Sequence, residues 1–141
     1  MHTQTHQTHS EVETRLLGEK IAVRFPAPQI ILLHVQMGAG KTALTKGLAR
    51  GYGLEDPSIV HSPSFSLVNE YPLSSGTIYH IDLYRLDSTR DLYSIGLDEI
   101  LWSDQIVIIE WAEKLKLQYP PPVRIEITVA EDETRTITIR P

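Results

Sequence analysis

The chain has 141 residues, of which 41% are hydrophobic and 22% are charged, and its formal net charge is −5. This length and composition are typical of one globular domain. No apolar run reaches the roughly 18 residues of a membrane span, and the absence of cysteine excludes disulfides, thiolate catalysis and cysteine-based zinc sites. We expect a cytoplasmic protein without a membrane or zinc partner.

The N-terminal segment MHTQTHQTH is polar and does not read as a signal peptide. We expect a disordered tail over residues 1–9, with solvated histidines rather than a metal site, and a single domain over residues 10–141. Ser10 then opens an S-x-x-E capping box. The spacing that follows predicts a helix over 11–23, with its apolar residues at Val12, Leu16, Leu17, Ile21 and Val23.

The middle of the chain alternates apolar runs with helical patterns. IILLHV (30–35) predicts a buried strand, residues 41–50 predict a helix that ends at Gly51 and Gly53, and residues 54–66 predict a loop. SLVNEYPL and TIYHIDLYR predict two strands around an SSG turn, and Ser88 with Asp91 predicts a short helix through Tyr93.

The last third predicts a second buried strand, QIVIIE (105–110), followed by a short helix over WAEKLKLQ that three prolines end. VRIEITV and TRTITIR alternate apolar with polar residues and predict a terminal hairpin. Apolar strands separated by helices predict an α/β fold whose sheet is covered on both faces.

The stretch VQMGAGKTAL (35–44) lies between the first buried strand and its helix. That context, with GAGKT in it, is typical of a phosphate-binding loop, because glycines let backbone N–H groups point at an anion and the helix adds its positive end. Lys41 is expected to reach the β- and γ-phosphates of a nucleotide, and Thr42 to bind Mg²⁺. The fold class we predict is therefore a P-loop NTPase-like three-layer sandwich, with a mostly parallel sheet, helices on both faces and a C-terminal β-hairpin.

A P-loop also needs an acid near the metal, usually at the end of a neighbouring strand. Two predicted strands end in a carboxylate, TIYHID at Asp82 and IVIIE at Glu110. Two such acids beside a P-loop favour a functional site over solvated strand ends.

GAGKT, SPSF (62–65), NEY (69–71), HIDLYRL (80–86) and IEW (109–111) occur in this order at compatible spacing. Together they resemble the TsaE family, small P-loop ATPases that take part in making threonylcarbamoyladenosine in bacterial tRNA. The resemblance runs from about Glu13 to the terminal hairpin. The combination of HIDLYR and IEW behind GAGKT is specific, whereas NEY alone carries little weight.

The resemblance implies that ATP and Mg²⁺ are the cofactors and that Asp82 acts catalytically on the attacking water, with Lys41 on the phosphates. It implies Mg²⁺ ligands at Thr42 and Glu110. It also implies a switch-like contact from Ser64, where the family usually has threonine, and places Tyr84 and Arg85 at a partner surface or in support of the site. The implied nucleotide-binding residues are Gly38, Ala39, Gly40, Lys41, Thr42, Ala43, Ser64 and Trp111.

The family implies the partners TsaD and TsaB, with tRNA reached only indirectly through their complex. The acidic balance and the scattered basic residues agree with this, because a chain that binds nucleic acid alone usually carries a basic patch. Two alternatives are a non-catalytic nucleotide-sensing module of the same assembly and a small-molecule P-loop kinase, although the chain has no Arg-rich lid. A GTPase is disfavoured, since no N-K-x-D motif occurs.

One departure from the family lies at the entrance of the loop. The family normally reads G-D-L before GAGKT, whereas this chain has Val35, Gln36 and Met37. If the loop keeps its usual shape, valine at this position carries strain of about 1–3 kcal/mol, and Val35→Gly tightens ATP binding. If the loop has instead adapted, with Gln36 and Met37 adjusting the turn, glycine brings no gain and loosens the fold through added chain entropy. We expect the first outcome. The departure is also the feature that favours the non-catalytic alternative.

Overall fold

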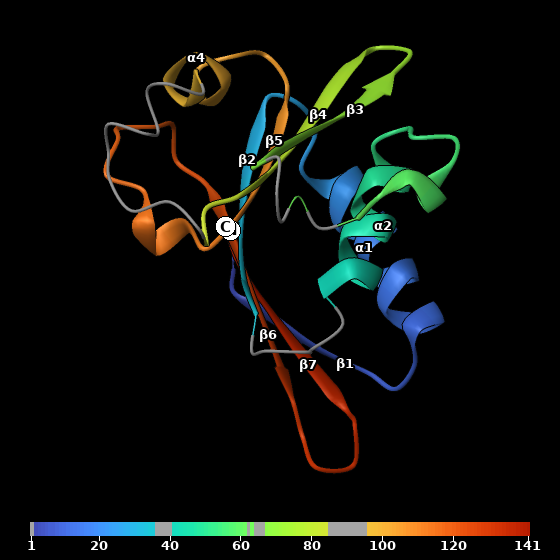
Figure 1. Cartoon of the computed structure of the whole chain (residues 1–141). Coiled ribbons are helices and arrows are strands. Elements are labelled where there is room, and N and C mark those ends of the chain that lie inside the picture. The colour runs from blue at the N-terminus through green and yellow to red at the C-terminus, as the bar shows by residue number, and fades with distance from the viewer. Residues whose placement is uncertain (1, 36–40, 62, 64–66, 85–95) are drawn as a thin grey trace.

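The computed structural model describes residues 2–35, 41–61, 63, 67–84 and 96–141, with only the backbone of Lys41. Within this part of the chain, seven strands form one sheet in the order β1-β7-β6-β2-β5-β4-β3 (Figure 1). The four adjacent strands β6, β2, β5 and β4 are parallel, while β3, β7 and β1 each join the sheet through an antiparallel pair. The strand bounds are β1 Gln4–Thr8, β2 Gln29–Val35, β3 Val68–Leu73, β4 Gly76–Asp82, β5 Ile106–Glu110, β6 Val123–Val129 and β7 Arg135–Arg140.

Helices lie on both faces of this sheet (Figure 1), which confirms the predicted α/β sandwich and its C-terminal hairpin. Helices α1 (Glu11–Arg24) and α2 (Lys41–Gly51) cover one face, and the short helix α4 (Leu97–Leu101) and the 3-10 turn η2 (Ala112–Lys114) lie on the other. A second 3-10 turn, η1 (Pro57–Ile59), follows α2. The buried residues divide accordingly into one core under α1 and α2 and a second core under α4.

The N-cap half of the capping box is present, since the Ser10 hydroxyl accepts a hydrogen bond from the Glu13 amide at 3.1 Å, while the Glu13 carboxylate accepts from the amide of His9 at 2.8 Å. The apolar face expected for α1 is wrong in part. Val12, Leu16 and Val23 are exposed, whereas Ile21 is buried as expected, together with three small residues: Thr14, Gly18 and Ala22.

Small residues allow α1 and α2 to approach closely. A Cβ added at Gly18 would lie 2.7 Å from the carbonyl oxygen of Leu44, and one added at Gly47 would collide with the Arg15 backbone. The two helices are therefore in backbone contact at these two positions.

The disordered tail expected over residues 1–9 is also wrong. Gln4–Thr8 forms the edge strand β1, paired antiparallel with β7 from the other end of the chain. Only Thr8 is buried, where its hydroxyl lies 2.7 Å from that of Thr14. A strand with one buried side chain has no apolar alternation, so its sequence resembles a tail.

Of the predicted helix over 111–118, only the 3-10 turn Ala112–Lys114 forms. Trp111 before it has φ +61°, a left-handed conformation that cannot belong to a right-handed helix. Helix α4, which the sequence did not predict, follows Gly96 at φ +72°. The short helix predicted over residues 88–93 lies outside the described residues.

Val35 is not strained, contrary to our expectation. It is the last residue of β2, its register partner is Ile127 of β6, and its half-buried side chain packs on the core under α1 and α2. It is absent from the residues with positive φ. Extended backbone suits a β-branched residue, so the valine is accommodated by a strand that continues to this position.

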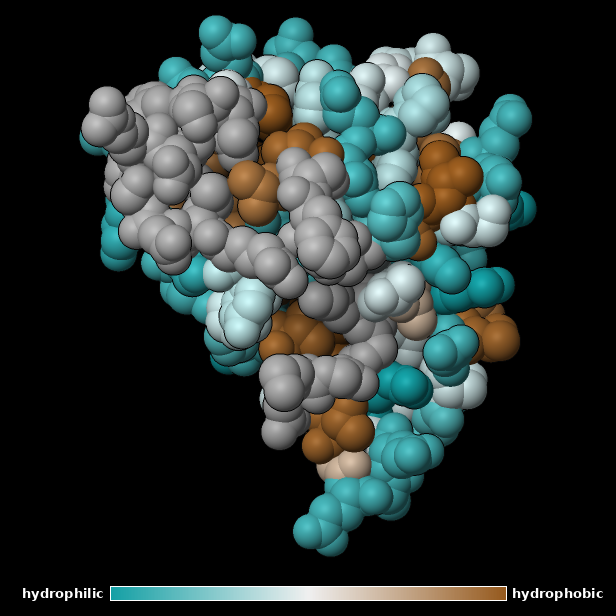
Figure 2. All heavy atoms as spheres, in the orientation of Figure 1, coloured by the Kyte–Doolittle hydropathy of each residue, from teal (hydrophilic) through white to brown (hydrophobic). Residues whose placement is uncertain are grey.

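No helix among the described residues is long and apolar enough to cross a membrane. On the face shown in Figure 2, hydrophobic residues lie in small separate patches among hydrophilic ones. The exposed large hydrophobic residues are Val12, Leu16, Val23, Ile59, Tyr84, Trp102 and Trp111.

Candidate functional site

Three parallel strands place their carboxyl ends side by side. In the register of the sheet, Leu33 of β2 lies next to Glu110 of β5, and Glu110 lies next to Asp82 of β4. Strand β2 continues to Val35, and α2 begins at Lys41. The two acids predicted from sequence therefore end neighbouring strands at the edge where the candidate loop leaves the sheet, which is the usual ligand edge of an open α/β sheet.

Both carboxylates face the helical layer that contains α2. Side chains alternate along a strand, so Asp82 shares a face with Ile78, and Glu110 shares one with Ile108. Ile78 and Ile108 belong to the core under α1 and α2. The carboxylates thus point to the same side of the sheet as the first turn of α2, and they are buried, with 7% of Asp82 and 2% of Glu110 exposed.

The start of α2 carries two of the expected nucleotide residues. Thr42 is exposed and Ala43 is buried. The side chain of Lys41, and Gly38, Ala39, Gly40, Ser64 and Arg85, lie outside the described residues. For this part of the site, the structure therefore describes the end of β2 and the start of α2, which flank the loop in the sequence.

Asp82 is held by backbone on both sides. Its Oδ1 accepts a hydrogen bond from the Tyr84 amide at 2.9 Å, and its own amide donates to the carbonyl of Leu67 at 2.9 Å. The first contact fixes the carboxylate orientation at the strand end. The second contact connects Leu67, which follows residues 64–66 in the sequence, to the end of β4.

Trp111 follows Glu110 in the left-handed conformation already described. Such a conformation costs an L-residue about 1–2 kcal/mol and frequently marks a functional position. The exposed Trp111 ring packs against Tyr84, with ring centroids 4.8 Å apart, and Lys114 donates to the Tyr84 carbonyl. An aromatic pair therefore lies on the surface next to both acids, with the ring planes of Tyr84 and Trp111 tilted by 47°.

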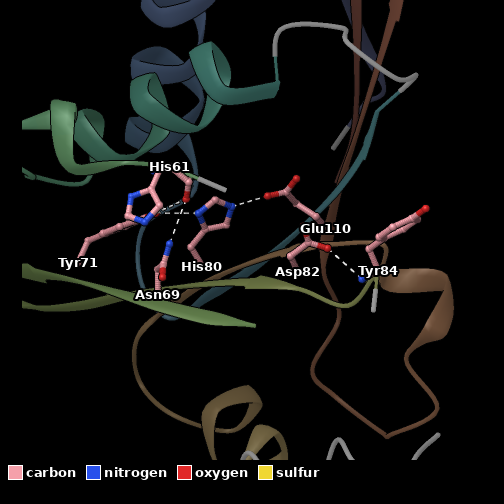
Figure 3. A network of polar contacts seen from close by, with 7 residues as sticks. All are labelled: His61, Asn69, Tyr71, His80, Asp82, Tyr84 and Glu110. Atoms are coloured by element: carbon pink, nitrogen blue, oxygen red, sulfur yellow. Dashed lines mark hydrogen bonds and ion pairs between the residues drawn. The ribbon is translucent and has the colours of Figure 1, made fainter. Parts of the chain in front are cut away.

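A buried chain of hydrogen bonds runs into Glu110 from the other side (Figure 3). His80 Nε2 lies 2.5 Å from Glu110 Oε2, and His80 Nδ1 lies 2.9 Å from the Tyr71 hydroxyl. The Tyr71 hydroxyl also lies 3.1 Å from the His61 carbonyl, which accepts from Asn69 Nδ2 at 3.0 Å. Burial raises the pKa of Tyr71, and the charge of Glu110 adds to the rise, so the hydroxyl keeps its proton at neutral pH.

Comparison with known proteins decides which family this site belongs to. The family model described as "Threonylcarbamoyl adenosine biosynthesis protein TsaE" matches residues 8–137. The chain belongs to the TsaE family. It is 36% identical to the tRNA threonylcarbamoyladenosine biosynthesis protein TsaE of Rickettsia conorii, over 95% of this chain and 76% of that protein.

Further relatives of the same name give the same result. The TsaE protein of Aquifex aeolicus is 36% identical over 92% of this chain and 90% of its own length, and that of Bacillus subtilis is 36% identical over 94% and 82%. A crystal structure of Bacillus subtilis YdiB superimposes with a TM-score of 0.74 at 30% identity, covering 98% of this chain and 84% of that one. Members of this family take part in tRNA threonylcarbamoyladenosine biosynthesis. The superposition shows that this chain has the same fold as YdiB.

The donor atoms at this TsaE site fit Mg²⁺. The hydroxyl of Thr42 and the carboxylate of Glu110 are oxygen donors of the kind Mg²⁺ prefers, and Mg²⁺ usually takes only one or two protein carboxylates together with substrate phosphates. Among the described residues no group of three or more His, Asp or Glu side chains could form a metal cage.

Our sequence reading missed His80, Tyr71 and Asn69. The signal was present, because His80 is two residues before Asp82 and strand alternation places both on one face. NEY, to which we gave little weight, supplies Asn69 and Tyr71 from the strand paired with β4. Asn69 and Tyr71 both lie close to the His61 carbonyl because of the register of the strands, and a sequence motif does not specify strand register.

Proposed function

We propose that this TsaE protein binds ATP with Mg²⁺ where β2, β5 and β4 end, and hydrolyses it when it works with TsaD and TsaB in the cytoplasm. The observation that carries the proposal is the placement of Asp82 and Glu110. They end adjacent parallel strands and face α2, and the GAGKT segment connects β2 to α2. A nucleotide bound by that segment has both carboxylates on its side of the sheet.

Each residue has a separate task in this proposal. Lys41 attracts the phosphates, while Thr42 and Glu110 hold the metal ion. When bound, Mg²⁺ neutralises the charge on the phosphate oxygens. Asp82 is oriented by the Tyr84 amide and accepts a hydrogen bond from the attacking water, which aligns it with the γ-phosphate. Trp111 and Tyr84 offer the nucleotide or the partners an aromatic surface beside the site.

The dependence on partners follows from charge. The chain carries a net charge of −5, and Arg50 and Arg140 are paired with carboxylates at 3.7 and 2.7 Å. An acidic protein of this kind is poorly suited to hold tRNA, whose binding is dominated by phosphate contacts. TsaD and TsaB would hold the RNA and carry out the threonylcarbamoyl transfer, and ATP hydrolysis by this chain would reset their complex between rounds.

A non-catalytic nucleotide sensor was favoured by Val35 alone. Val35 is the paired last residue of β2, which removes backbone strain at this residue as a reason to favour that alternative. An experiment can distinguish the ATPase from the sensor, because a sensor binds ATP but does not hydrolyse it.

The test is reconstituted threonylcarbamoylation of tRNA by TsaD and TsaB, with and without this protein, following modified tRNA and ATP consumed. The proposal predicts that repeated rounds need this protein and that ATP is consumed in step with them. Full modification with a non-hydrolysable ATP analogue would support the sensor instead. Equal modification without the protein would overturn both.

A further inference from the structure

His80 is a buried titratable residue to which the proposed function gives no task. Only 2% of it is exposed, and it lies in the middle of β4 between Tyr71 of β3 and Glu110 of β5 (Figure 3). Both ring nitrogens have a partner. A histidine that merely filled the core would need partners, but those partners would not have to include a carboxylate at the ligand edge of the sheet.

The donors and acceptors of this contact have a fixed direction. An ionised carboxylate only accepts, so Nε2 of His80 donates to Glu110 Oε2, at 2.5 Å. In the neutral ring Nδ1 is then the acceptor, and the Tyr71 hydroxyl lies 2.9 Å from it. The contact with Tyr71 therefore fixes the ring orientation, and the ring fixes one oxygen of Glu110.

The same hydroxyl reaches the loop after α2. The one hydrogen of this hydroxyl is directed at Nδ1 of His80, so its hydrogen bond to the loop is the one that it accepts from the His61 amide at 3.4 Å, while the His61 carbonyl oxygen lies 3.1 Å from Oη. Asn69 donates to the same carbonyl, so two side chains of β3 hold one peptide of the loop. On the far side of residue 64, Leu67 is held by the amide of Asp82. His61 is thus attached to β3, and Leu67 is attached to Asp82 at the end of β4.

We propose that His80 is a positioning residue, which orients the Glu110 carboxylate for Mg²⁺ and, through Tyr71, holds the peptide of His61 in a fixed relation to that carboxylate. The role toward Mg²⁺ rests on the proposed function, whereas the connection from Glu110 to His61 does not. Partners that orient a metal-binding side chain are worth about 10- to 100-fold in metal affinity.

Three substitutions separate the two halves of this connection. In His80→Gln, the amide nitrogen can reach the position of Nε2, so donation to Glu110 is kept while the Tyr71 contact is lost. In His80→Asn, the shorter side chain reaches only the position of Nδ1, so Tyr71 keeps a partner and Glu110 does not. Tyr71→Phe removes only the hydroxyl. The matched control is Tyr79→Phe, on the same strand but facing the other core.

The first measurement is calorimetric titration of Mg²⁺ into the full-length protein with ATP, together with ATP affinity in EDTA. His80→Asn should raise the Mg²⁺ concentration needed for half-saturation about 10-fold or more, with metal-free ATP affinity near that of Tyr79→Phe. His80→Gln should recover most of the loss. Mg²⁺ affinity in His80→Asn within twofold of the parent, or no recovery by His80→Gln, would overturn the role toward the metal.

The second measurement is amide hydrogen exchange without nucleotide. If the connection exists, Glu110→Ala, which removes the oxygen that accepts from His80, and Tyr71→Phe should both speed exchange of the His61 amide, although Glu110 does not touch His61, and Tyr79→Phe should not. Unchanged exchange in Glu110→Ala would overturn the connection. If the parent protein shows no Mg²⁺-dependent ATP binding, the proposed function and the metal role fail together, and the exchange result alone decides the connection.

Discussion

Asp82 and Glu110 are register partners at the ends of adjacent parallel strands, on the same face of the sheet, yet their surroundings differ. Asp82 Oδ1 accepts from a backbone amide at the surface turn of Tyr84, whereas Glu110 Oε2 accepts from the buried imidazole of His80. Environments that differ in this way let two neighbouring carboxylates carry separate roles. We therefore expect substitutions at the two positions to have different effects.

Replacement of the loop lysine tests phosphate binding. Lys41→Ala removes a charged hydrogen-bond donor worth about 1.5–3 kcal/mol, so ATP affinity should fall about 10- to 100-fold. Lys46→Ala, one turn further along α2, is the control and should bind normally. Calorimetric titration of ATP decides the matter, and a Lys41→Ala protein that binds ATP as tightly as the parent would refute the P-loop assignment.

Replacement of the buried glutamate tests metal binding. Glu110→Gln keeps the shape but removes the charge, so the Mg²⁺ concentration needed for half-maximal ATP hydrolysis should rise about tenfold or more. Excess Mg²⁺ should restore most of the rate. Glu113→Gln, an exposed acid three residues on, provides the control. A Glu110→Gln protein with the Mg²⁺ requirement of the parent would remove Glu110 from the metal site.

Much of this site could be predicted from sequence because its parts are local. A buried strand, a glycine loop and a helix start lie next to one another in the chain, and Asp82 and Glu110 each end an apolar run. The hydrogen bonds from His61 through Tyr71 and His80 to Glu110 could not be predicted in this way. They join four segments whose side chains meet only through strand register, and register is a property of the folded sheet.

The fold errors have related causes. Strand β1 buries one side chain and pairs with residues more than a hundred positions away, so nothing in its own sequence marks it as a strand. Helix α1 turns small residues rather than its large apolar ones toward α2, because only small side chains fit the backbone contact at Gly18 and Gly47. In both cases the local structure depends on a segment that is distant in the sequence, β7 for β1 and α2 for α1, rather than on local propensity.

Val35 gives a prediction opposite to the one expected from the motif. Val35→Gly should lower the free energy of unfolding by about 1–2 kcal/mol, since it removes a packed side chain and loosens a paired strand. ATP affinity should not improve. Thermal melting and an ATP titration on the same sample measure both effects. Tighter ATP binding with an unchanged melting temperature would restore the strain hypothesis.

The isolated protein should bind tRNA weakly. With a net charge of −5, we expect a dissociation constant no tighter than about 1 µM at physiological salt, the range of non-specific binding. Gel-shift titrations at two salt concentrations, with and without TsaD and TsaB, measure this. A tight, salt-sensitive complex of tRNA with this chain alone would contradict the division of labour that we propose.

The most direct test of the account is phosphate release by Asp82→Asn in the presence of TsaD, TsaB and tRNA. Asparagine keeps the oxygen that accepts from the Tyr84 amide, so the turn is retained and only the carboxylate charge is lost. The account predicts ATP binding within about twofold of the parent and hydrolysis lowered by about 100-fold or more, the usual contribution of a positioned acid or base. Hydrolysis at the parent's rate by the Asp82→Asn protein would contradict it.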